Sequence, residues 1–187
     1  MNNSNLFQKR YLIPIGTSLI LGGLFFIAIT NVFFSSKKIT SGMITEEVAK
    51  LAYIFQRIDQ TCSILSFDYQ KNPINFLNVK TFTGSEVGPM NLVHPEKWEG
   101  PYLEDNPTIQ GKEYQVVKTN QGYFITPGDG VKLPNGKIVG VDIVLDEKAD
   151  IAALMRDENA LMFQGKALAA PLGKVGQQEI VLGDTGA

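Results

Sequence analysis

The chain begins with a long run of apolar positions that no charged side chain interrupts. Residues 11–34 read YLIPIGTSLILGGLFFIAITNVFF and contain no Asp, Glu, Lys, Arg or His. A helix of this length rises about 36 Å, more than the ~30 Å of a bilayer's hydrocarbon core. A cleaved signal peptide has an apolar core of only about 7–15 residues, and a buried core helix is seldom apolar on every side. The run therefore predicts one transmembrane helix over residues 11–34, after a short tail of residues 1–10.

Basic residues flank this run almost equally, with Lys9 and Arg10 before it and Lys37 and Lys38 after it. The preference of Lys and Arg for the cytoplasmic side of a membrane therefore gives little information about the orientation of this helix. Because only ten residues precede the run, we expect the N-terminus in the cytoplasm and residues 35–187 on the other side of the membrane.

Within the run, Ser18 and Gly22 are four residues apart and would lie on one side of the helix. Small residues at this spacing let two membrane helices approach closely. Glycine is also simply common in membrane helices. The pair is thus a candidate helix–helix contact.

After the run, apolar positions recur every three or four residues, which is the period of a helix with one buried face. This stripe predicts an amphipathic helix over residues 44–67, with Cys62 buried as a small hydrophobic residue. Gly42 would either separate this helix from the membrane helix or be absorbed into one long helix. The stripe consists of Ile44, Val48, Leu51, Phe55, Ile58, Cys62 and Leu65.

The remainder predicts a long loop followed by an antiparallel sheet. Residues 68–111 are rich in Pro and Gly, but their scattered apolar residues predict packing against the helix, with a short helix or turn near residues 72–78. Residues 114–118 and 123–126 read as two strands of a hairpin. Further strands are expected at 131–133, 137–145, 160–163, 166–169 and 179–182, with a short helix at 150–156. We thus predict an α+β domain over residues 35–183, with its sheet at 113–182 laid across the helix and a frayed tail at 184–187.

Composition excludes several classes of function. The 187 residues carry 17 Lys and Arg against 19 Asp and Glu, so the chain lacks the strong basic field of many nucleic-acid-binding proteins. One cysteine, Cys62, and one histidine, His94, allow neither an intramolecular disulfide nor a four-ligand Cys/His zinc site. We expect no nucleic-acid partner.

Candidate chemistry is equally sparse. The glycines around Gly130 and Gly136 have the wrong spacing for a phosphate-binding loop, and a Cys62–His94 nucleophile would require two distant residues to meet. Asp129, in a tight Pro-Gly-Asp-Gly loop, could contribute to a calcium site, but a carboxylate satisfied by its own turn is the simpler interpretation. The sequence therefore predicts no catalytic site, no cofactor and no enzymatic activity.

One motif resembles a known family. The segment Trp98-Glu99-Gly100-Pro101-Tyr102-Leu103 is similar to the Trp-x-Gly-Pro-Tyr-Leu segment of the major pseudopilins of type II secretion systems. The order of elements over residues 12–145 also resembles type IV pilin-like proteins, in which an apolar N-terminal helix continues into an amphipathic helix packed on an antiparallel sheet. The specific residues of the resemblance cover 98–114.

The resemblance implies both a role and a location. Trp98, Gly100, Pro101 and Tyr102 would anchor the loop to the helix. The protein would be a structural component of a secretion or pilus-like assembly in the bacterial inner membrane, with a periplasmic or extracellular domain. Its partners would be the lipid bilayer, other assembly subunits and further copies of itself.

Two features of that family are not found here. Prepilin-type proteins carry a small residue before the apolar run and a Glu five residues into it, whereas here Arg10 precedes Tyr11 and the first acidic residue is Glu46. A single-pass anchor carrying an unrelated small β-rich binding module is therefore the alternative.

Overall fold

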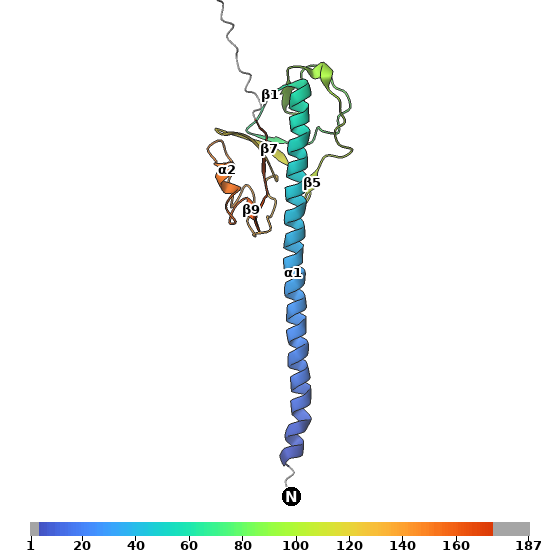
Figure 1. Ribbon diagram of the computed structural model, residues 1–187, viewed down its shortest axis with the longest axis vertical. Helices are drawn as coiled ribbons and strands as arrows, with labels where there is room; N and C mark the ends of the chain where they lie inside the picture. The colour runs from blue at the N-terminus through green and yellow to red at the C-terminus, as the bar shows by residue number, and fades with distance from the viewer. Residues whose placement is uncertain (1–3, 174–187) are drawn as a thin grey trace, which may run out of the picture. The chain divides into compact units, whose positions relative to one another are not determined.

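The structure is a computed structural model, which describes residues 4–173 (Figure 1). The chain divides into two compact units, Met1–Ile39 and Thr40–Ala187. The fold is α+β, with one long apolar N-terminal helix and several antiparallel sheets.

The helix α1 runs without a break from Ser4 to Cys62 and includes Gly42, so it absorbs the predicted boundary. The prediction of a helix to residue 67 is wrong. Ser63 adopts a left-handed φ of 54°, and the Asp59 carboxylate accepts a hydrogen bond from the Ile64 N–H at 2.8 Å. A left-handed residue with satisfied polar groups is a common way to end a helix.

The predicted stripe on the second half of α1 is buried in the second unit. Its members up to Cys62 are at most 1% exposed. Leu65 is the exception at 54%, because it lies in strand β1 (Ile64–Phe67), where alternate side chains face opposite sides. Ring contacts join α1 to the residues after it, with Phe55 centred 6.0 Å from Phe67 and 6.1 Å from Phe76.

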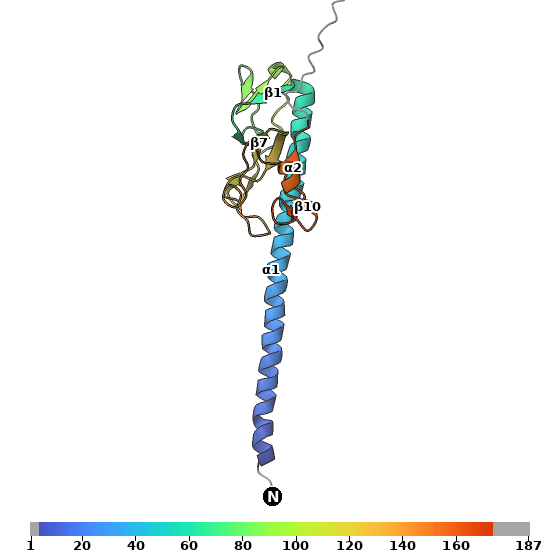
Figure 2. The ribbon, with the colours of Figure 1, turned by 90° about the vertical axis from the view of Figure 1, so that its left-hand side faces the viewer.

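The largest sheet has four antiparallel strands in the order β11-β8-β7-β2. Its centre is the predicted hairpin, in which Thr119 pairs with Gly122 around a two-residue turn. Figure 2 shows β7 and β1 beside the second half of α1. The strands are β2 (Lys71–Pro73), β7 (Gln115–Thr119), β8 (Gly122–Thr126) and β11 (Ala170–Pro171).

The segment predicted as a loop, residues 68–111, contains several short strands and a 3-10 turn, so that prediction is wrong in detail. Near residues 72–78 there is a strand and then a turn, because the buried Asn72 side chain bonds the carbonyl oxygens of Tyr69 and Val116. The elements are β3 (Glu86–Val87), β4 (Met90–Leu92), η1 (Pro95–Lys97) and β5 (Thr108–Ile109), which pairs with β6 (Lys112–Glu113). Strands β1, β4 and β3 form one sheet in that order.

Residues 131–145 contradict the predicted strand at 137–145. They form only isolated bridges, Lys132 to Ile138 and Val139 to Ile143. Gly136 and Gly140 have φ values of 92° and 81° and turn the chain away from an extended course. The bridge from Lys132 to Ile138 does connect the two sides of the predicted turn.

The last described elements agree better with expectation. Helix α2 (Ile151–Leu154) is capped by the Asp150 carboxylate, which accepts from the Ala153 N–H at 2.9 Å. Strands β9 (Met162–Phe163) and β10 (Lys166–Ala167) pair across the predicted turn. The predicted strand at 179–182 and the frayed tail at 184–187 lie outside the described residues.

Candidate functional site

The first half of α1 carries apolar side chains that no other part of the described residues 4–173 covers. Leu19, Ile20 and Phe25 are between 65% and 72% exposed although they point in three different directions around the helix. Among the described residues, α1 is the one helix long and apolar enough to cross a membrane.

Two threonine hydroxyls in this apolar half form hydrogen bonds within the helix. The Thr17 hydroxyl donates to the Pro14 carbonyl at 3.0 Å, and the Thr30 hydroxyl donates to the Ile27 carbonyl at 2.9 Å. Such internal bonds lower the cost of placing a hydroxyl in hydrocarbon. Ser18 and Gly22 are both exposed, and a Cβ on Gly22 would meet nothing within 4 Å. The surface at the predicted helix–helix contact is therefore open within one copy.

The predicted loop anchor is built around Trp98. Its indole N–H donates to the Val79 carbonyl at 3.1 Å. The Trp98 ring meets the Tyr102 ring edge-on at 4.8 Å and the Phe82 ring at 5.4 Å. Edge-on aromatic pairs add to the free energy gained by burial. The Trp98 indole thus connects Val79 and Phe82, which precede it in the loop, with Tyr102, which follows it.

Gly100 fits this arrangement because it lacks a side chain. A Cβ there would lie 2.2 Å from the Trp98 indole nitrogen and 2.5 Å from the Val79 carbonyl oxygen. The next peptide bond, Gly100–Pro101, is cis. Beyond it, the Tyr102 N–H donates to the Leu77 carbonyl at 2.8 Å. The motif's glycine therefore permits a close approach between the backbone and the indole.

Arg57 connects the loop anchor to α1. Its guanidinium donates to the Glu99 carboxylate at 2.8 Å and lies 5.8 Å from the centre of the Tyr102 ring. The Tyr102 hydroxyl accepts a long hydrogen bond of 3.4 Å from the Glu99 N–H. Partial burial raises the pKa of the Tyr102 phenol. The structure thus brings Trp98, Gly100 and Tyr102 together, and Arg57 connects them to α1.

The sequence did not predict a second set of hydrogen bonds that stabilises this loop, formed by Asn106. The Asn106 side chain accepts from the Leu77 N–H at 3.0 Å and donates to the Asn75 carbonyl at 2.7 Å and the Asn78 side chain at 2.9 Å. The signal available in the sequence was the Asn106-Pro107 pair, since Asn before Pro is typical of turns.

Asp129 has a lysine partner in the structure. Its carboxylate lies 2.8 and 2.9 Å from the Lys71 ammonium, and the Gln115 amide donates to it at 3.4 Å. Among the residues that the structure describes, no three His, Cys, Asp or Glu side chains gather closely enough to hold a metal ion. The Lys71 ammonium supplies the positive charge at the Asp129 carboxylate.

Cys62 and His94 meet through their backbones. The His94 N–H donates to the Cys62 carbonyl at 2.8 Å. The imidazole Nδ1, however, lies 3.4 Å from the Glu96 carboxylate, while Cys62 is wholly buried. This backbone hydrogen bond joins the last residue of α1 to His94. The Cys62 thiol occupies the buried position that the apolar stripe predicts.

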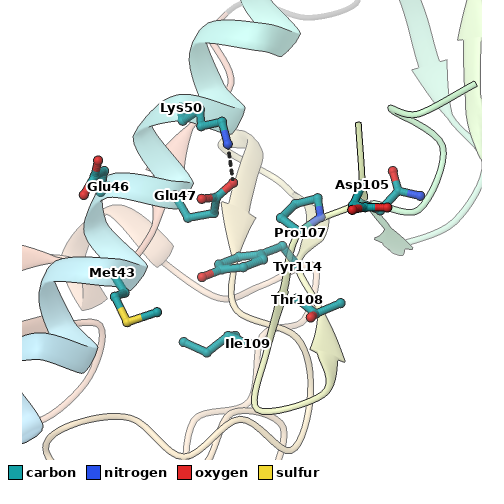
Figure 3. A pocket seen from close by; sticks show the side chains of 10 residues that line it. Met43, Glu46, Glu47, Lys50, Asp105, Pro107, Thr108, Ile109 and Tyr114 are labelled. Carbon is teal, nitrogen blue, oxygen red and sulfur yellow. Dashed lines mark hydrogen bonds and ion pairs between the residues drawn. The ribbon is translucent and has the colours of Figure 1, made fainter. Parts of the chain in front are cut away.

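A groove of about 430 Å³ lies in the second unit between α1 and the loop that leads into β5 (Figure 3). Glu46, Glu47 and Lys50 line it from α1, and Asp105 lines it from the loop. Tyr114 lies between these two sides, is 2% exposed, and points its hydroxyl toward α1 (Figure 3).

Comparison with known proteins identifies no relative: no family model, no curated protein and no solved structure matches this chain.

Proposed function

We propose that this protein is a membrane-anchored, pilin-like structural component of a bacterial type II secretion or pilus-like assembly, and that it acts through protein–protein contacts. In this proposal residues 11–34 cross the inner membrane once. The N-terminus lies in the cytoplasm, and the α+β domain lies in the periplasm or outside the cell.

The observation that carries the proposal is the contrast along α1. Its first half is apolar and exposed on every side, whereas the stripe on its second half is buried. A helix that is apolar on all sides is stable in a bilayer or against other apolar helices, where its backbone groups are bonded internally. One element thus offers an anchor and a support for the folded domain.

The loop anchor supports a structural role. Trp98, Tyr102 and Asn106 bond to backbone and aromatic groups of their own unit, so their polar atoms hold the loop in place. The Trp-x-Gly-Pro-Tyr-Leu resemblance rests on the same residues. A surface fixed in this way suits repeated contacts between subunits, which need a defined shape.

One observation favours the alternative of a single-pass anchor with an unrelated β-rich binding module. Arg10 stands where prepilin-type proteins have a small residue, and no acidic residue precedes Glu46. Such a protein would stay monomeric in the membrane and bind a different partner.

Cross-linking in native membranes separates the two proposals. A lysine-reactive bifunctional reagent should give a ladder of products that rises in steps of one chain mass, 20.6 kDa, beyond the dimer. A monomer band alone would contradict the assembly role. The intact mass adds a second readout, because a chain starting near Tyr11 with an added methyl group would indicate pilin-type processing, and a full-length chain would favour the alternative.

The candidate helix–helix contact can be tested in the same assay. Gly22→Leu should shorten the ladder because a large side chain keeps neighbouring helices apart. Gly23→Leu is the matched control, since its Cβ also meets nothing within 4 Å and it lies about 100° further around the helix. Equal loss in both variants would mean that Ser18 and Gly22 form no specific contact.

A further inference from the structure

We propose that residues 179–182 of this same chain bind, as one more antiparallel strand, in a groove between α1 and the edge strand β11. The groove is called the Tyr53 groove below. Both of its walls belong to one copy of the second unit, so the contact is independent of the proposed assembly role.

The Tyr53 groove has a volume of about 610 Å³, and α1 forms one of its walls. Four residues of this wall follow the spacing i, i+3, i+4 and i+7, which places them on one face of the helix. They are Ala49, Ala52, Tyr53 and Gln56. Tyr53 is 68% exposed, whereas the apolar stripe on the same stretch of α1 is buried. The groove therefore offers an uncovered face of α1 with an aromatic ring between small residues.

The other wall of the Tyr53 groove, residues 170–173, is the edge of a sheet. Within residues 4–173, β8 is the one strand that pairs with β11. The Leu172 N–H donates to the Tyr123 carbonyl of β8 at 2.9 Å. Because backbone groups alternate between the two sides of an antiparallel ladder, those of Pro171 and Gly173 face away from β8. Such an edge binds an extended segment through main-chain hydrogen bonds.

The chain continues directly from the Tyr53 groove. Gly173 lines the groove, and fourteen residues follow it in the sequence. Among these fourteen, Ile180, Val181 and Leu182 are three consecutive apolar residues, and two of them are β-branched, as is typical of strands. The five residues 174–178 match the length of a hairpin connection, about two to five residues. Residues 179–182 can therefore return antiparallel beside β11.

The short connection also favours the chain's own segment over that of a second copy. A segment joined by a short flexible connection has an effective concentration in the millimolar range at its site. As a strand in the groove, residues 180–182 present alternate side chains to the α1 face that carries Tyr53. The same strand adds main-chain hydrogen bonds at the edge of β11.

Hydrogen exchange of the full chain in detergent micelles, measured on peptides by mass spectrometry, tests the inference. The amides of residues 180–182 should exchange at least about tenfold more slowly than those of an unstructured chain. Tyr53→Asp should abolish this protection, because it places a charge against apolar residues. Tyr69→Asp should leave it unchanged, since Tyr69 is 65% exposed and lies outside the groove. Continued protection of β7 and β8 in both variants shows that the second unit is folded.

Two results of this experiment would overturn the inference. The first is exchange of residues 180–182 at the unstructured rate in the wild type. The second is protection that survives Tyr53→Asp, because the segment would then bind at a different place.

Cross-linking of introduced cysteines identifies which copy supplies the segment. Gln56→Cys, combined in turn with Val181→Cys and Leu182→Cys, should form a disulfide within the monomer on mild oxidation. Lys50→Cys with the same two partners is the control and should react much less, since Lys50 lies about 120° around α1 from Gln56. Equal yields from the two α1 positions would contradict the groove. A cross-linked dimer in place of the monomer would show that a second copy supplies the segment, and would overturn the assignment to the same chain.

Discussion

Two stretches of the same helix differ in what surrounds them. On residues 14–36 of α1, apolar side chains are exposed around the whole circumference. On residues 44–62 most apolar side chains are buried along one face, and Tyr53, at 68% exposed, is the large exception. Both stretches form α-helix, so helix formation alone does not distinguish them. The angular distribution of apolar positions does, because it determines whether the helix needs an apolar environment on all sides or on one.

The largest effect is expected from charged side chains placed in the exposed half of α1. Phe25→Arg with Phe26→Arg should weaken membrane insertion by roughly 5–7 kcal/mol, since each arginine near the centre of a membrane helix costs about 2.5–3.5 kcal/mol. The fraction of protein that resists carbonate extraction measures this. Leu65→Arg is the control, because Leu65 is exposed in the second unit. Equal retention of the double variant and the control would contradict a bilayer environment for residues 11–34.

The reverse test is a cavity in the buried stripe. Phe55→Ala should lower the free energy of unfolding of the second unit by about 3–5 kcal/mol, because it deletes a wholly buried ring. Phe25→Ala removes the same ring from an exposed position and should change that free energy by less than about 0.5 kcal/mol. Denaturation of the full chain in detergent micelles gives both values. A similar loss in both variants would show that the two halves share one environment.

A pair of glycine substitutions sharpens the comparison within the second unit. Gly100→Ala should destabilise it by about 1–3 kcal/mol, because the new Cβ collides with Trp98 and the Val79 carbonyl. Gly42→Ala, where a Cβ meets nothing within 4 Å, should stabilise it by up to about 1 kcal/mol through helix propensity. Thermal unfolding gives the two signs. A neutral Gly100→Ala would mean that the loop anchor is not held as described.

The smallest expected effect concerns pH. Burial and the nearby Glu47 raise the pKa of the Tyr114 phenol above its usual value of about 10. Above pH 10 the unfolded chain therefore loses this proton before the folded chain does, so stability falls as pH rises; below pH 10 both states keep the proton and nothing changes. Denaturation at pH 9 and pH 11 should show a smaller decrease for Tyr114→Phe than for the wild type. Tyr69→Phe removes a largely exposed phenol and should leave the decrease unchanged.

How much of this fold follows from the sequence depends on the range of the interactions involved. The stripe from Ile44 to Cys62 and the hairpin around Asn120 were predicted because their signals are local, namely a period of 3.6 residues and a short turn. The end of α1 was missed because the Asp59 carboxylate and the left-handed Ser63 end it before Leu65, the next residue in the apolar stripe.

Long-range contacts account for the rest. The Asn72 side chain in strand β2 donates a hydrogen bond to the distant Val116 carbonyl. The Asn106 side chain stabilises the loop by accepting a hydrogen bond from the Leu77 N–H. Neither partner can be predicted from the residues next to it in the sequence. The apolar run after Lys137 was predicted as a strand because its residues favour one, but glycines with positive φ bend it. In the candidate site, the motif indicated Trp98 and Tyr102, whereas Arg57 and the groove around Tyr114 emerged only from packing.

The central claim is that the bilayer surrounds the first half of α1 while the folded domain covers one face of the second. It can be tested by placing a fluorophore on single cysteines introduced along α1 of the full chain in bilayers, and comparing quenching by lipid-attached and water-soluble quenchers. We predict that lipid quenching dominates at every position across residues 14–34, and that water accessibility across residues 44–62 rises and falls with a period of three to four residues. Water accessibility with that same period across residues 14–34 would contradict the account.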